Sequence, residues 1–356
     1  MHCFGLNDPA LNRLLLAVNS ALWPTLGFVR FLLALIVAGG HLAWFTEKGD
    51  LVAELKQFSP LVAVMSFLFL SGYSIAASYE RDNAQFYFRR ALRILPLYVP
   101  VVVASACLPI FYPGGVLGLE APSYYQTVLN LCFAQGFIFP SIDSNPVVWT
   151  LSLEVFFYLV APLLARASNR TLLVLSCVSA LAYINVGSFM FVHHPSAMWG
   201  LNALLLGWAW ILGFWVYRAR GNSASIALAI GFVAVSLQHT GIQKWWIFTW
   251  ALPFAALIFS ERITLRPAAR KSFLFLGDVS YPLYLVHFPL YALLGALDFP
   301  KVGALFIMCA LLAATILDLA YDKPAKRLIL ALAARRSRTP EVEMASANRP
   351  EALAVD

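Results

Sequence analysis

Residues 30–41 read RFLLALIVAGGH, an apolar run that holds one arginine and one histidine. Arg30 and His41 are eleven positions apart, and at about 100° per residue this separation is within about 20° of three whole helical turns. Both side chains therefore leave the same face of a helix, roughly 16 Å apart along its axis. If the run crosses a bilayer, a charge and a titratable group share one inward stripe, which is costly unless a partner, water or a ligand compensates. A pair placed in this way indicates a functional site.

The composition around this run is that of a membrane protein. Of the 356 residues, 61% are hydrophobic and only 12% are charged, and the mean hydropathy is +0.75. A soluble domain of this size cannot hide so much apolar surface. The five cysteines lie far apart and form no CxxC pair, so neither a zinc site nor a disulfide framework is indicated, and no metal is expected.

Apolar runs long enough to cross a ~30 Å hydrocarbon core predict an all-α fold, a polytopic transmembrane helical bundle of about ten spans. Residues 1–24 are expected to form a cytoplasmic or interfacial lead-in, 25–330 the transmembrane domain and 331–356 a disordered cytoplasmic tail. A weaker apolar patch from Val128 to Phe139 favours a surface-lying or re-entrant helix. The ten spans are placed at about 27–46, 59–79, 93–112, 147–166, 171–190, 198–217, 224–239, 245–260, 273–295 and 302–320.

The lysine and arginine residues predict which side each loop faces. With ten spans, 20 of the 25 basic residues fall on the side of the two termini. This imbalance is the positive-inside pattern, so both termini are expected in the cytoplasm and the protein in the inner membrane, in contact with its lipids. The net charge of +7 is then an orientation signal, and no nucleic-acid partner is expected. The four basic residues of the opposite side are Lys48, Lys56, Lys244 and Lys301.

Three titratable groups from distant spans are expected at one depth. The assumed topology places His41, Glu154 and His287 in the outer half of the membrane, where a lone charge costs about 2.5–3.5 kcal/mol or more. A histidine beside a carboxylate is a general-base arrangement, because the carboxylate fixes the ring tautomer and stabilises the imidazolium. We therefore expect His41 to be a catalytic base that Glu154 orients. The alternative is a structural hydrogen-bonded pair that ties helices together.

Two further groups of residues suggest binding or chemistry. Arg90 and Arg93 are i,i+3 neighbours at the cytoplasmic boundary, where Arg30 also opens, and this geometry suits phosphate oxygens. Ordinary positive-inside anchoring explains the same arginines. Ser71 interrupts the second span, but small residues in membrane helices usually serve close packing, and no GxSxG elbow supports a serine nucleophile.

These residues coincide with motifs by which the chain resembles the membrane acyltransferase-3 family over about residues 10–330. The first motif is Arg30-x10-His41, and the others follow in the family's order. They are Phe69-Leu-Ser71-Gly72-Tyr73, Phe88-Arg89-Arg90-x-x-Arg93-Ile-Leu-Pro96, Trp149-Thr-Leu-Ser152-Leu-Glu154-x-x-Phe157-Tyr158, Leu276-Gly277-x-x-Ser280-Tyr281-x-x-Tyr284-Leu-x-His287 and Tyr321-Asp322-Lys323-Pro324. The last motif departs from the family, which more often has glutamate at the position of Asp322.

The resemblance implies an integral-membrane O-acyltransferase that takes an acyl group, usually acetyl, from cytoplasmic acyl-CoA. The acceptor would be a hydroxyl of an extracytoplasmic or lipid-linked glycan. Acyl-CoA is then a co-substrate, and no permanently bound cofactor is expected. On this interpretation Arg30, Arg90 and Arg93 hold the CoA phosphates, His41 and Glu154 are catalytic, and the substrate-binding residues are Ser71, Tyr158, Tyr281, His287 and Trp149. For Trp149, stacking on a sugar competes with membership of an interfacial aromatic belt.

Other classes of function remain open on the sequence. His41, Glu154 and His287 would also serve as the proton relay of a secondary transporter, or of an exporter of an acylated envelope molecule. No repeat relates 1–166 to 171–330, as a transporter with two related halves would show. A scaffold for polysaccharide assembly does not explain three ionisable groups at one depth. Some relatives carry a C-terminal hydrolase-like domain that this chain is expected to lack, so it would finish the transfer itself, rely on a separate extracytoplasmic transfer protein, or use an acceptor that reaches the membrane.

Overall fold

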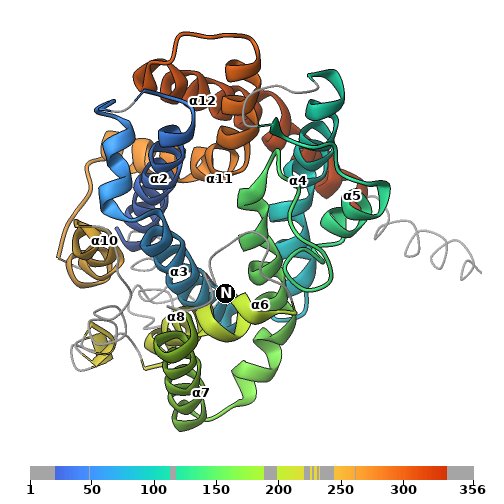
Figure 1. Ribbon diagram of the computed structural model, residues 1–356. Coiled ribbons are helices and arrows are strands. Elements are labelled where there is room, and N and C mark those ends of the chain that lie inside the picture. Colours follow the sequence, from blue (N-terminus) through green and yellow to red (C-terminus); the bar gives the residue numbers. More distant parts are fainter. Residues whose placement is uncertain are drawn as a thin grey trace, which may run out of the picture.

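A computed structural model describes residues 21–47, 49–112, 118–187, 199–219, 225, 226, 228–230, 232, 244–260 and 262–334. Within these residues every regular element is a helix (Figure 1), which confirms the helical class. Residues 1–20 of the expected lead-in and residues 335–356 of the expected tail lie outside the described residues. Residues 22–24 already belong to the first described helix, and residues 331–334, predicted as tail, continue a helix that runs from 323 to 334.

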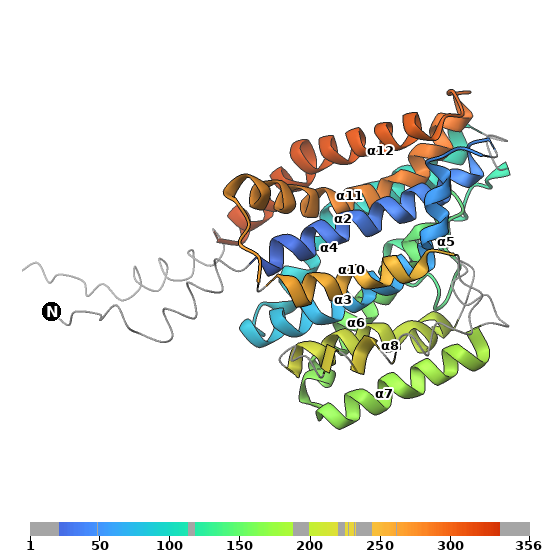
Figure 2. The ribbon, with the colours of Figure 1, turned by 90° about the vertical axis from the view of Figure 1, so that its left-hand side faces the viewer.

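The elements follow one another as helices joined by short connections. The long helices run side by side across the bundle, with α7 at one edge and α12 at the other (Figure 2). Their bounds are α2 Leu22–His41, η1 Leu42–Trp44, η2 Ala53–Phe58, α3 Pro60–Arg81, α4 Phe86–Phe111, α5 Tyr124–Leu131, η4 Pro146–Val148, α6 Trp149–Arg166, α7 Asn169–Ala182, η5 Tyr183–Gly187, α8 Leu201–Arg218, α10 Trp246–Phe259, α11 Pro267–Ala296, α12 Gly303–Leu317 and η6 Asp318–Asp322.

In the part of the chain that the structure describes, seven helices are long and apolar enough to cross a membrane, so this is a multi-pass membrane protein. They are α2 with η1, α3, α4, η4 with α6, α7 with part of η5, α11, and α12 with its continuation to Ala334. α8 and α10 are helices where two more spans were predicted, but α10 has only 14 residues, and α8 ends in the polar pair Tyr217 and Arg218. Most of the predicted span at 224–239 lies outside the described residues. The count of ten spans therefore stays a prediction.

The helix predicted around Val128 to Phe139 is in a different place. α5 occupies Tyr124–Leu131, and the chain then turns at Cys132 and Phe133. Phe133 has a φ of +59°, a left-handed conformation that a helix cannot continue through. The apolar residues that follow Phe133 lie in turns. Phe133 and Phe137 pack against the core of the bundle, so an apolar residue here does not indicate a helix.

Two glycines bring the backbones of α3 and α8 into contact. A Cβ added at Gly72 would lie 1.9 Å from the carbonyl oxygen of Trp210, and one added at Gly213 would lie 1.9 Å from that of Phe69. No larger residue fits at either crossing, and close approach of this kind is how small residues hold membrane helices together. The crossing brings the side chain of Trp210 to Ser71, the neighbour of Gly72.

The chain before α6 inserts between other helices. Pro289 of α11 has no N–H to bond the carbonyl of Leu285, four residues earlier. The side-chain amide of Asn145 donates to that carbonyl instead, at 3.1 Å. Asn145 is fully buried, so the polar side chain is tolerated because it satisfies a carbonyl that the proline leaves without a partner.

The same loop meets α4 in the same way. Pro109 leaves the carbonyl of Ser105 without its helical donor, and the hydroxyl of Ser144 donates to it at 2.5 Å. The loop is therefore fixed at two proline positions, one on α4 and one on α11, and it sets where α6 begins.

Candidate active site

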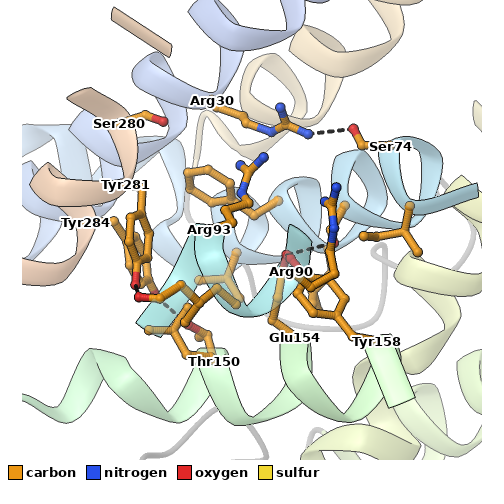
Figure 3. Close-up of a pocket in the computed structure, with 17 residues that line it drawn as sticks. Arg30, Ser74, Arg90, Arg93, Thr150, Glu154, Tyr158, Ser280, Tyr281 and Tyr284 are labelled. Carbon is orange, nitrogen blue, oxygen red and sulfur yellow. Dashed lines mark hydrogen bonds between the residues drawn. The ribbon is translucent and has the colours of Figure 1, made fainter. Parts of the chain in front are cut away.

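A cavity opens among α2, α3, α4, α6 and α11 (Figure 3). Its volume is about 790 Å³, part of which is open to the surroundings. Seven of the predicted site residues line it: Arg30, Ser71, Arg90, Arg93, Glu154, Tyr158 and Tyr281.

Three guanidinium groups converge on this cavity. Arg30 of α2 donates to the hydroxyl of Ser74 at 2.5 Å and to the carbonyl of Leu70 at 3.4 Å. Arg90 and Arg93 come from the first three turns of α4, and their i,i+3 spacing puts both on the cavity side. Among the residues that the structure describes, Arg93 makes no hydrogen bond or ion pair. The three guanidinium groups can therefore bind an anion together.

Arg90 is held in place from both sides. Its guanidinium donates to the hydroxyl of Ser78 at 3.0 Å, and it lies 5.8 Å from the ring centres of Phe86 and Tyr158. Cation–π contacts of this kind stabilise a guanidinium without neutralising it. Arg90 thus keeps its charge for a ligand.

Glu154 is the carboxylate of the cavity lining. Its Oε1 accepts hydrogen bonds from Ser71 at 2.9 Å and from Tyr158 at 2.5 Å. Ser71 in turn accepts from the indole N–H of Trp210 at 3.2 Å. Three guanidinium groups and one carboxylate leave the lining with an excess of positive charge, which an anionic ligand would balance.

The expected contact between Glu154 and His41 does not form. The Nδ1 of His41 lies 3.0 Å from the Nε2 of His287, whereas Glu154 is bonded to Ser71 and Tyr158. The reason is lateral packing, since α2 packs extensively against α11 and α3 lies against α6. The prediction from equal depth agrees with the contact between His41 and His287. It paired Glu154 with His41, however, whereas Glu154 contacts Ser71 and Tyr158. Neither His41 nor His287 lines the cavity.

Tyr284 connects the cavity with the histidine pair. Its ring lines the cavity and lies 6.1 Å from the ring of His287, while Phe67 packs edge-on against it at 5.7 Å. The Tyr284 hydroxyl is 2.7 Å from that of Thr150. Tyr284 therefore borders both the cavity and His287, and Phe67, which also lines the cavity, packs against it.

The sequence prediction did not include Tyr284, Thr150, Ser74 or Ser280 as site residues, although all four line the cavity. Tyr284 could have been found, because it lies at i+3 from Tyr281 and i−3 from His287 and so shares their helix face. Trp149, which was predicted, is buried at the start of α6 and is not part of the lining.

Comparison with known proteins places this geometry in context. A family model described as an acyltransferase domain matches residues 23–318. Nodulation protein 10 of Rhizobium leguminosarum bv. viciae is 28% identical over 219 residues, which are 57% of this chain and 57% of that protein. The match thus spans little more than half the length of that relative. "Putative acetyltransferase ORF330" of Acidianus two-tailed virus is 26% identical over 293 residues, 76% of this chain and 84% of that protein. No solved structure matches the chain.

Proposed function

The chain belongs to the family of the acyltransferase domain that matches residues 23–318, and from this premise we propose that it transfers an acyl group from a CoA thioester to a hydroxyl group. The observation that carries the proposal is the convergence of Arg30, Arg90 and Arg93 on one cavity with a single carboxylate, Glu154. The relative named an acetyltransferase supports acetyl as the acyl group.

The arginines hold the phosphates of the donor. Guanidinium groups match phosphate oxygens with paired, charge-assisted hydrogen bonds, and a CoA carries several phosphates on one end. Arg30, which Ser74 fixes, and Arg93, which has no described protein partner, are directed into the same space as Arg90. Glu154 limits the excess charge and holds Ser71 and Tyr158 in place. The anionic end of the donor thus occupies the arginine side of the cavity.

The acyl end of the donor extends toward His41. The helical rise puts His41 roughly 16 Å from Arg30 along α2. When the arginines hold the phosphates, the flexible arm of CoA must span this distance for the thioester to reach His41. Tyr284 borders both the cavity and His287, so its ring must line the passage or move aside when the arm is bound.

His41 acts as the general base. Its ring takes the proton of the acceptor hydroxyl, the hydroxyl oxygen bonds to the thioester carbonyl carbon, and the carbon–sulfur bond breaks. The CoA thiolate that leaves takes up a proton, and the products are the ester and free CoA. His41 is only half-buried, so an acceptor can reach its ring.

The acceptor is a hydroxyl of a carbohydrate or lipid-linked glycan on the far side of the cytoplasmic membrane. In support, the protein is a multi-pass membrane protein, and the predicted loop charges put the arginine cavity toward the cytoplasm, where acyl-CoA is made. A separate extracytoplasmic protein could complete the delivery. A glycan acceptor is also compatible with the exposed ring of Trp44 beside His41, at 5.9 Å between ring centres.

The test offers radiolabelled acetyl-CoA to the purified protein in lipid vesicles, with a glycan or glycolipid fraction of the source cells as acceptor. Wild type is expected to label the acceptor. His41→Ala should retain folding and membrane insertion and lose about 10²–10⁴-fold in rate, as removal of a general base does. Near-wild-type product from His41→Ala would reject the base, and counterflow without transfer by the wild type would reject the enzyme in favour of a carrier.

A further inference from the structure

Of the two histidines in contact, His41 and His287, the proposed reaction uses only His41. His287 is completely buried in α11, whereas His41 is half-buried at the end of α2. We infer that His287 is a positioning residue that holds the His41 ring in the one neutral tautomer whose Nε2 is free to accept a proton. The inference rests on the proposed function for the role of His41, but the arrangement of protons can be tested without it.

The direction of the hydrogen bonds follows from the backbone. The Nδ1 of His287 lies 3.1 Å from the carbonyl oxygen of Leu283. A carbonyl oxygen can only accept, so this nitrogen must carry the proton. A neutral imidazole has one ring proton, which leaves the Nε2 of His287 as an acceptor.

The same reasoning then fixes His41. Its Nδ1 lies 3.0 Å from the Nε2 of His287, so Nδ1 of His41 carries the proton and donates it. No residue that the structure describes bonds Nε2 of His41, so this nitrogen is the available base.

The environment of His287 keeps it in this position. Its ring is packed between those of Tyr284 and Tyr291, with centres 6.1 and 5.7 Å away. The adjacent Phe288 packs edge-on against His41 at 5.5 Å. The Asn145 side chain holds the neighbouring Leu285 carbonyl. The helix therefore presents His287 rigidly, while the ring it orients stays accessible.

A matched pair of substitutions separates positioning from packing. The terminal amide of glutamine reaches about where Nε2 of histidine lies, so His287→Gln can accept from His41. The shorter amide of asparagine reaches about where Nδ1 lies, so His287→Asn can bond the Leu283 carbonyl but not His41. Both variants put an uncharged amide in the same place in the core.

We expect His287→Gln to keep most of the wild-type kcat, and His287→Asn to lower kcat by about 10- to 100-fold, as loss of an outer-shell orienting partner does in metal sites. The KM for acetyl-CoA should stay unchanged in both, because the arginine cavity is separate from the pair. Wild-type kcat in His287→Asn, an equal loss in both variants, or a change confined to KM would overturn the inference.

A spectroscopic measurement tests the proton positions directly. In lipid bilayers, ¹⁵N-histidine resonances assigned to His41 should show a protonated Nδ1 and a bare Nε2 in wild type, and a shift toward protonated Nε2 in His287→Asn but not in His287→Gln. A protonated Nε2 in the neutral wild-type ring would overturn the inference. If the tautomer is as expected but the wild type transfers no acetyl group, the proposed function fails and the positioning of the ring stands.

Discussion

Adjacent arginines at the start of α4 differ in what they can contribute. Arg90 and Arg93 line the cavity, whereas the neighbouring Arg89 is paired with Asp82 and does not. Position on the helix, and not residue type, decides which of the cluster can meet a ligand. The sequence alone showed a dense basic cluster and could not separate these two uses.

We predict that Arg90→Ala and Arg93→Ala each raise the KM for acetyl-CoA about 10- to 100-fold, since a hydrogen bond to a charged group contributes about 1.5–3 kcal/mol. Arg89→Ala is the control and should leave KM unchanged, although the loss of the ion pair with Asp82 can lower thermal stability slightly. Steady-state kinetics in lipid vesicles measure all three. Equal effects at Arg89 and Arg90 would mean that the cluster acts only through its general positive charge.

Among the helices, α11 depends on a side chain from outside it. Asn145 supplies the hydrogen bond that Pro289 cannot, and it does so two residues before His287. A loop that is distant in sequence thus supports the part of α11 that holds the histidine.

We predict that Asn145→Ala lowers the free energy of unfolding by about 1–3 kcal/mol, because it leaves the buried carbonyl of Leu285 without a donor. Pro289→Ala should partly rescue it, since alanine restores a backbone N–H four residues after Leu285. Thermal unfolding of the two single variants and the double variant forms the necessary cycle. Strict additivity of the two effects would show that the two residues do not share this carbonyl.

The loop between α2 and α3 is tied to α12 by one carboxylate. Asp50 accepts from the backbone N–H of Gly303 at 2.6 Å, and from those of Val52 and Ala53 at 2.9 and 3.0 Å. Burial by itself would raise the pKa of Asp50, but these three hydrogen bonds hold it below its ordinary value of 3.8. Because the folded state favours the carboxylate, its contribution is complete above the ordinary pKa and is lost as the pH falls below it.

Asp50→Asn should therefore lower the unfolding free energy by about 1 kcal/mol at neutral pH, the usual effect of losing a helix cap. The difference from wild type should shrink as the pH falls below 3.8, the ordinary pKa of this carboxyl, because the unfolded chain then binds a proton that the folded Asp50 does not yet bind. Glu54 of the same loop, which is only partly buried, is the control, and Glu54→Gln should change stability less. A difference that persists undiminished in acid would show that the charge of Asp50 is not what matters.

Across the whole molecule, the start of α2 and the end of the helix that continues α12 lie at the same end of the bundle (Figure 2). Such an arrangement agrees with both termini on one side of the membrane. Which side this is remains a prediction from the loop charges, and the arginine cavity faces the cytoplasm only if it is correct.

Single cysteines in a cysteine-free variant test the orientation. Leu51→Cys, in an 89% exposed position before α3, should react with a membrane-impermeant maleimide in intact cells. Ala84→Cys, exposed between α3 and α4, should react only after permeabilisation, because Arg81, Arg89 and Arg90 flank it on the predicted cytoplasmic side. The reverse labelling would turn the protein over and place the arginine cavity away from cytoplasmic acyl-CoA.

Most of the helices could be predicted because a bilayer admits few alternatives. Every backbone group in the hydrocarbon must be satisfied internally, so long apolar runs are helices. The helical repeat then gave the shared face of Arg30 and His41, and the inward-facing residues of α4. The α5 helix was misplaced because apolar residues in turns carry no helical period.

The contacts between neighbouring helices could not be predicted from the sequence. Periodicity gives the face of a residue and topology its depth, but neither says which helices are neighbours. That is decided by backbone crossings such as Gly72 with Trp210 and by carbonyls freed at prolines. Arg30, Arg90, Arg93 and Glu154 could be selected as candidates from their sequence positions alone. That Glu154 bonds Ser71 while His41 bonds His287 was decided only when α2 packed against α11 and α6 against α3, because hydrogen bonds depend on ångström distances that no residue pattern encodes.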